Sequence, residues 1–163
     1  MSEENTKMPR RVVDADLYIN TLRELVREGH RVSMLITGSS MNPFLIHARD
    51  TIFIEKPVMP FKKGDMVFYQ RKSGQFVMHR IFRVCTNEEG QNVYYMVGDA
   101  QQEIEGPVEE HMIFGQITSV CRKGKRISKG NIWWEFFEHI WIRMIPLRPL
   151  MIRIYGAVCR LKR

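Results

Sequence analysis

The chain has 163 residues and a formal net charge of +7, which suits one domain with a real core and an appendage but is short for two domains. The charge is uneven: residues 122–163 contain eleven Lys and Arg against two Glu, a net of +9, which leaves −2 on residues 1–121. The basic character therefore belongs to the C-terminal tail and does not indicate a nucleic-acid partner.

The three cysteines, Cys85, Cys121 and Cys159, are odd in number and widely spaced. This pattern fits neither a disulfide framework nor a clustered zinc site. We expect reduced, half-buried thiols, and we expect neither a bound metal nor a cofactor.

The first predicted element is an amphipathic helix from about Asp14 to Glu28. Asp14 or Asp16 can cap its first amide groups, and Gly29 suits its C-terminal end. Apolar residues recur at helical spacing along it and predict one face packed on the rest of the protein: Leu17, Leu22, Leu25 and Val26.

Residues 31–128 change to short runs rich in Val, Ile, Phe and Tyr, separated by turn residues such as Asn-Pro, Lys-Gly-Asp and Gly-Asp. Such runs at this spacing predict a mainly β fold, with a coiled antiparallel sheet or partial barrel. We therefore divide the chain into a polar arm and helix over 1–30, a β-rich domain over 31–128, and an aromatic, basic helical tail over 129–163.

The tail has helical periodicity, with polar residues from Asn131 to Arg143 on one narrow stripe, and Pro146 and Pro149 separate it from a second helix. Either the two helices pack on the β-rich domain, or they form an in-plane membrane anchor or a docking surface for a membrane partner. We favour the second interpretation. The residues of its broad apolar arc are Trp133, Trp134, Phe136, Phe137, Ile140, Trp141 and Met144.

Localisation follows from two further observations. No stretch reaches the roughly 18 uncharged apolar residues that a membrane-spanning helix needs. The polar N-terminus has no apolar core of the signal-peptide type. We therefore expect peripheral membrane association through residues 131–160, with the cytoplasmic face favoured.

Three short features of the β-rich domain could perform chemistry together. They are the turn Ser39-Ser40, the pair His79-Arg80 within a strand, and Asp99, which follows Gly98 at the end of another strand. A serine hydroxyl needs a nearby base to become nucleophilic and needs donors that stabilise the developing oxyanion.

The order of these features resembles a known family. The boxes GSSMNPFL (38–45), GDMVFY (64–69), MHRI (78–81) and VGDA (97–100) are similar to those of type I signal peptidases and the related self-cleaving LexA-type proteases. Most bacterial members have a lysine base where this chain has His79, so the chain resembles the histidine branch typified by the endoplasmic-reticulum enzymes.

The resemblance implies a role for each matching residue. The serine directly before Met is the nucleophile of this superfamily, which makes Ser40, rather than Ser39, the attacking residue. His79 would accept its proton without the large pKa shift that a lysine base requires. Asp99 would hold the imidazole tautomer, as in a Ser-His-Asp triad.

Other matching residues are expected to have structural roles. Arg80 should point to the opposite face of the strand from His79 and form an ion pair with an acidic residue. Asp65 should shape a turn. Met41 and Pro43 should shape the nucleophile turn and the floor of the substrate groove.

The chain departs from the family at two places. Many signal peptidases have a helping hydroxyl two residues before the nucleophile, where this chain has Gly38, so the oxyanion would be stabilised by the amide of Ser40 with a contribution from Ser39. Family members also have a transmembrane segment before the Ser-Met box, where this chain has the amphipathic helix.

Three functions are compatible with these patterns. The first is a serine endopeptidase that cleaves signal or leader peptides near a membrane and binds an extended substrate segment with small residues before the scissile bond. The second is a catalytically inactive module that binds a peptide or a membrane. The third, a self-cleaving DNA-binding regulator, requires a helix-turn-helix, for which a single helix of about fifteen residues is too little.

Overall fold

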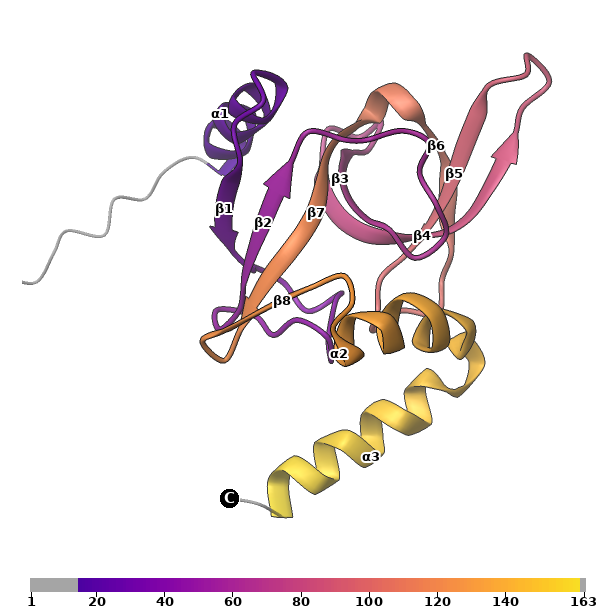
Figure 1. Ribbon diagram of the computed structural model, residues 1–163. Coiled ribbons are helices and arrows are strands. Elements are labelled where there is room, and N and C mark those ends of the chain that lie inside the picture. Colours follow the sequence, from indigo (N-terminus) through magenta and orange to yellow (C-terminus); the bar gives the residue numbers. More distant parts are fainter. Residues whose placement is uncertain (1–14, 162–163) are drawn as a thin grey trace, which may run out of the picture.

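The computed structural model describes residues 15–161, and its centre is an antiparallel β-sheet that does not close into a barrel (Figure 1). Within these residues the neighbouring strands follow the order β1, β2, β7, β3, β4, β5, β6, and β8 pairs with β7. The strands are β1 (Val32–Leu35), β2 (Thr51–Glu55), β3 (Met66–Gln70), β4 (Phe76–Thr86), β5 (Asn92–Val97), β6 (Glu105–Glu109), β7 (Ile113–Arg122) and β8 (Lys125–Ser128). The predicted mainly β, antiparallel fold is confirmed.

The predicted N-terminal helix is present as α1 (Ala15–Arg27), and it ends before Gly29, which adopts the left-handed φ of +91°. Its packed face differs in part from the predicted one. Ile19, Leu22 and Val26 are buried, whereas Leu17 and Leu25 face solvent. The expected cap Asp14 and the side chain of Asp16 lie outside the described residues.

The long strand β4 contributes to both hydrophobic cores of the sheet. Met78 packs in the core that α1 and the C-terminal segment also join, while Ile81 packs in a smaller core next to β5 and β6. His79 and Arg80 lie between these two residues and are buried as well. Their burial follows from their position in β4, because side chains on both faces of this stretch meet a core.

The first half of the tail packs against the sheet. It contains α2 (Ile132–Glu135), the π-helical turn η2 (Phe136–Ile140) and the 3₁₀ turn η3 (Trp141–Arg143). The side chains of Trp134, Phe137 and Trp141 are buried in the same core as α1, and the rings of Phe137 and Phe44 lie 4.9 Å apart. For these aromatic residues, packing on the β-rich domain is confirmed, so they are not free to enter a membrane.

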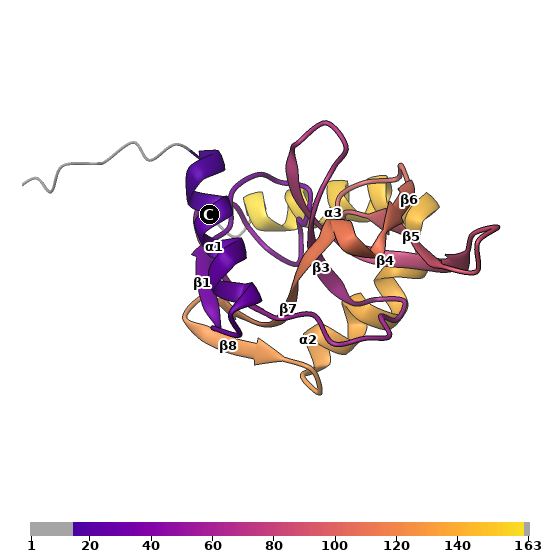
Figure 2. The same cartoon turned by 90° about the horizontal axis from the view of Figure 1, so that it is seen from above.

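The second half of the tail contains the turn η4 (Ile145–Leu147) and helix α3 (Arg148–Leu161); a further 3₁₀ turn, η1 (Glu110–Met112), lies between β6 and β7. Figure 1 shows α3 extending from the body at the end opposite to α1, and Figure 2 shows α1 alongside β1. In residues 15–161, no helix is long and apolar enough to cross a membrane.

Candidate active site

The two adjacent serines lie in the loop that joins β1 to β2. Hydrogen bonds close this loop at its base, from the Ile36 amide to the Asp50 carbonyl (2.8 Å) and from the Ala48 amide to the Ile36 carbonyl (2.9 Å). Gly38 has a φ of +86°, a left-handed conformation that glycine adopts without strain. A side chain at position 38, such as the serine that many signal peptidases have there, would therefore be strained in this loop.

The structure distinguishes the two serines. Ser39 is exposed, whereas Ser40 is half-buried, and the Ser40 carbonyl accepts a hydrogen bond of 2.8 Å from the Ala100 amide. The next residue, Met41, is buried in the core and anchors the loop. Pro43 is also buried.

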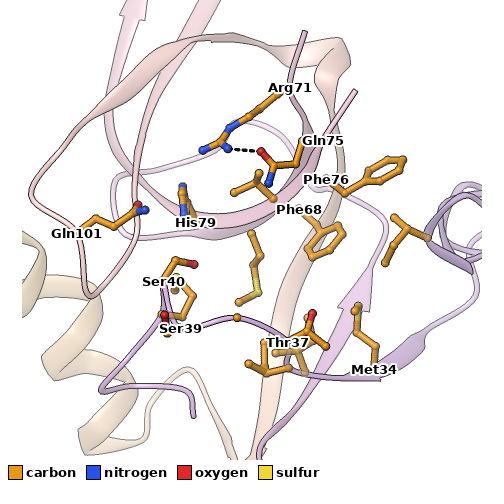
Figure 3. Close-up of a pocket in the computed structure, with 17 residues that line it drawn as sticks. Met34, Thr37, Ser39, Ser40, Phe68, Arg71, Gln75, Phe76, His79 and Gln101 are labelled. Atoms are coloured by element: carbon orange, nitrogen blue, oxygen red, sulfur yellow. Dashed lines mark hydrogen bonds between the residues drawn. The ribbon is translucent and has the colours of Figure 1, made fainter. Parts of the chain in front are cut away.

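A groove of about 540 Å³ runs between this loop and β4 (Figure 3). Ser39, Ser40 and Met41 line one side and His79 lines the other. Neither Pro43 nor Asp99 is among the lining residues. Much of the remaining wall is apolar and includes Ile19, Met34, Ile36, Ile52, Phe68, Phe76, Val77 and Met78.

Figure 3 shows Ser40 and His79 on facing sides of this groove. Within the described part of the chain no direct hydrogen bond joins them. Catalytic hydrogen bonds are often long in a protein without substrate and shorten in the complex. The arrangement is therefore compatible with proton transfer from Ser40 to His79.

His79 is held as a neutral base. Only 2% of its surface is exposed, and burial lowers the pKa of His79 from 6.5 to about 4. The nearby Glu105 carboxylate acts in the opposite direction and raises the pKa, while the Arg71 guanidinium lowers it. The imidazole is therefore unprotonated at neutral pH and can accept a proton.

The Nδ1 side of His79 contacts a polar network from β3 and β6. The Tyr69 hydroxyl lies 3.2 Å from His79 Nδ1, and a Glu105 carboxylate oxygen lies 3.9 Å from the same atom. Arg71 binds Glu105 with two hydrogen bonds, one of them 2.6 Å long. Partial burial tends to raise the pKa of Glu105, but the bonds from Arg71 and Tyr69 outweigh it and keep this pKa low.

This network supports one tautomer of His79. Burial raises the pKa of Tyr69, so its hydroxyl stays protonated, and the Glu105 carboxylate beside it is an acceptor for that hydrogen. With the hydroxyl directed to Glu105, the Tyr69 oxygen can accept a hydrogen from Nδ1 of His79. The lone pair of the neutral imidazole then lies on Nε2.

Asp99 does not have the predicted contact with His79, and that prediction is corrected. Both of its carboxylate oxygens accept hydrogen bonds from Nε of Arg80, at 3.0 and 3.1 Å, and both side chains are fully buried. Alternation along β4 directs Arg80 away from His79, so the acid that pairs with Arg80 cannot also hold the imidazole. Tyr69 and Glu105 occupy that position instead.

Arg80 and Asp65 have the expected structural contacts. Arg80 forms the expected ion pair, with Asp99, and also donates to the Gly64 carbonyl at 3.1 Å. The Asp65 carboxylate accepts a bond of 2.8 Å from the Lys62 amide and so shapes the turn before β3.

The loop between β1 and β2, called the nucleophile loop here after the expected role of Ser40, contains backbone donors that could serve an oxyanion. Among the described residues, the backbone amides of Ser39, Ser40 and Met41 have no hydrogen-bond acceptor within the protein, whereas Gly38 donates to Nδ1 of His47 at 3.1 Å. Free amides beside a nucleophile can stabilise developing negative charge. Gln101, which the sequence analysis did not single out, also lines the groove.

Comparison of the sequence with protein-family models and with curated proteins finds no match. The function of the protein is therefore inferred from the geometry of the groove and from the four sequence boxes.

Proposed function

We propose that the protein is a serine endopeptidase of the signal-peptidase and LexA type, with Ser40 as nucleophile and His79 as general base. The observation that carries this proposal is that a half-buried serine and a buried neutral histidine, with its Nδ1 side occupied by Tyr69, line the same groove. Three of the four boxes of the resemblance contribute residues to the lining of this groove, and the fourth contacts Ser40 through the Ala100 amide, which also supports the proposal.

The chemistry follows from this arrangement. Ser40 Oγ attacks the scissile carbonyl while Nε2 of His79 takes its proton, and the amide of Ser40 stabilises the oxyanion. The C–N bond then breaks, and the leaving amine receives the proton from His79. Water, deprotonated by His79, attacks the acyl-enzyme; the ester C–O bond breaks and the proton returns to Ser40 Oγ.

The groove suits an extended peptide. Residues 76–79 of β4 pair with β3 on one side, whereas β5 pairs with β4 only from Arg80 onward, which leaves one edge of this stretch without a strand partner in the described sheet. On the other side of the groove, β1 pairs only with β2 within the described sheet, so it is an edge strand. An extended substrate can add its backbone to such edges; the preference for small residues before the scissile bond rests on the resemblance.

The test is cleavage of a pool of unfolded peptides, followed by mass spectrometry of the new ends. We expect the wild-type protein to cleave a defined subset and Ser40→Ala to cleave none, while Ser39→Ala retains activity, because Ser39 is exposed on the loop. Undiminished cleavage by Ser40→Ala would overturn the assignment. If the fold is instead an inactive binding module, a fluorophosphonate probe will fail to label Ser40 and the wild-type protein will cleave nothing.

The pH profile provides a second test. Because burial lowers the pKa of His79 to about 4, the acid limb of kcat/KM should have its inflection near pH 4, and activity should be retained at pH 5.5, where an ordinary imidazole with a pKa of about 6.5 is mostly protonated. An inflection near pH 6.5 would show that the working base is a solvated histidine.

We also propose that α3 holds the protein on an anionic membrane surface. Leu147, Leu150, Met151 and Ile154 follow the helical spacing i, i+3, i+4, i+7, and each is at least 37% exposed. Arg153 is exposed on the same helix. An exposed apolar stripe flanked by arginine suits the headgroup boundary of a membrane with acidic lipids.

Vesicle flotation tests this membrane proposal. Leu150→Glu combined with Ile154→Glu should abolish flotation with phosphatidylcholine vesicles that contain phosphatidylserine, because each change places a carboxylate on the exposed apolar stripe. Val58→Glu combined with Val84→Glu makes the same charge change at exposed valines of the β-rich domain and should float like the wild type. Equal flotation of the two double variants would contradict a membrane role of α3.

A further inference from the structure

The turn that follows β5 lies in direct contact with the nucleophile loop. The Ala100 amide donates to the Ser40 carbonyl at 2.8 Å, and the Gln101 amide donates to the Gly98 carbonyl at 3.1 Å. The contact is close, because a Cβ atom at Gly98 would lie 2.7 Å from the Ser40 carbonyl oxygen. The position of Ser40 therefore depends on the position of residues 98–101.

The C-terminal segment holds the other side of this turn. Nη1 of Arg148 donates to the carbonyls of Gly98 (2.7 Å) and Gln101 (2.8 Å). The indole Nε1 of Trp141 donates to the Asp99 carbonyl at 2.8 Å. Three of the four carbonyl groups of the turn are thus bound by two side chains that lie 40 or more residues later in the sequence.

Arg148 also joins its own segment together. Its Nη2 donates to the Trp141 carbonyl at 3.2 Å, and its side chain is fully buried although it is the first residue of α3. Burying a guanidinium is costly unless carbonyl or carboxylate groups receive its hydrogens. The Arg148 side chain therefore requires residues 98–101 in their present conformation.

We propose that Trp141 and Arg148 are positioning residues for the nucleophile. They hold the turn of residues 98–101, and this turn holds Ser40 at its distance from His79. The inference rests on the proposed peptidase function. It assigns the C-terminal segment a part in the catalytic step, in addition to its packing in the core.

The chain offers a matched pair of tryptophan substitutions for the test. Trp141→Phe removes the donor to the Asp99 carbonyl and keeps most of the ring. Trp134→Phe is the control, because it also removes an indole donor from a buried tryptophan of the same segment, but that donor binds the Glu138 carboxylate at 2.7 Å and does not touch the turn. Both variants are assayed with the fastest-cleaved peptide of the pool and with a fluorophosphonate probe that labels Ser40.

We expect Trp141→Phe to lower kcat and the rate of Ser40 labelling about tenfold, with KM and the acid limb of the pH profile unchanged. Trp134→Phe should keep kcat, even where it lowers the melting temperature. Arg148→Ala should lose more activity than Trp141→Phe, because it removes the donor to both the Gly98 and the Gln101 carbonyls.

The outcomes separate the inference from the proposed function. Wild-type kcat in folded Trp141→Phe and Arg148→Ala proteins would overturn the positioning role. Equal loss of kcat in Trp141→Phe and Trp134→Phe would do the same, because it would show that only packing matters. If Ser40→Ala cleaves as fast as the wild type, the peptidase assignment fails first.

Discussion

Replacing His79 with glutamine is expected to lower kcat/KM by about 10⁴-fold at neutral pH, the upper range for loss of a general base. The amide of glutamine can accept the hydrogen bonds of the site but cannot take a proton from Ser40. Among the residues that line the groove, His79 is the one histidine, and Tyr69 lies on its other side. The measurement is a full kinetic comparison on one peptide.

His111→Gln is the matched control, because His111 is exposed and lies between β6 and β7. It should retain wild-type kinetics. A loss of similar size in both variants would show that the effect does not come from the groove, and a loss of less than tenfold in His79→Gln would remove His79 as the base.

His79 should also make the stability of the protein depend on pH. Its pKa is about 4 in the folded protein and 6.5 in the unfolded chain, so the unfolded chain binds more protons between these values. Above pH 6.5 the imidazole is neutral in both states, so the protein keeps its full stability. As the pH falls toward 4, the unfolded chain takes up the proton first, and the free energy of unfolding falls by about 3 kcal/mol in total. Urea unfolding at several pH values should show this slope in the wild type and a smaller slope in His79→Gln.

Replacing Asp99 with alanine is expected to lower the free energy of unfolding by about 3–5 kcal/mol, because it leaves the buried guanidinium of Arg80 without its counter-charge. Arg80 and Asp99 are both fully buried, and Arg148 places a second buried cation near this pair. Thermal and urea unfolding measure the loss. Asp65→Ala is the control: it removes the bond to the Lys62 amide and should cost about 1 kcal/mol.

Asp99→Asn distinguishes the two roles that this residue could have. As the partner of Arg80, Asp99 supports the fold, so the asparagine variant should lose stability first and retain kcat wherever it is folded. If Asp99 were the third member of a triad, the asparagine variant would keep its stability and lose about 10⁴-fold in kcat. Selective loss of kcat would restore Asp99 to the catalytic group and contradict our correction.

The sequence predicted the mainly β fold, and it singled out Ser40 and His79, which line one groove in the structure. Alternating apolar runs and turn residues predict the sheet because their period is that of a β-strand. That Ser40 and His79 should be neighbours was implied by the resemblance of their boxes to signal peptidases and LexA-type proteases. Their common groove then follows from how the antiparallel strands bring the loop after β1 next to β4.

The role of Asp99 could not be predicted from its box alone, because a Gly-Asp pair does not specify the partner of the carboxylate. Three acidic residues, Asp99, Glu103 and Glu105, follow β5 within eight positions. One signal was available in the sequence: buried Arg80 also needs an acid, and it faces away from its neighbour His79. The contact of Glu105 with the imidazole depends on the pairing of β5 with β6, which local patterns do not specify.

The contacts of the C-terminal tail could not be predicted for a different reason. An arc of Trp and Phe has the same helical spacing whether it contacts lipid or a protein core. Trp134, Phe137 and Trp141 contact the core, whereas the stripe on α3 stays exposed. Periodicity identified the apolar residues but could not identify what covers them.

The contacts of Arg148 have a consequence for biosynthesis. Every strand of the sheet, the nucleophile loop and His79 are translated before residue 148, yet the turn behind Ser40 gains the Arg148 hydrogen bonds only when that residue has left the ribosome. A nascent chain that has already folded its sheet would therefore lack a fully ordered nucleophile. Under our proposals, the full rate of cleavage would be reached only after the segment that leads into α3 has been synthesised.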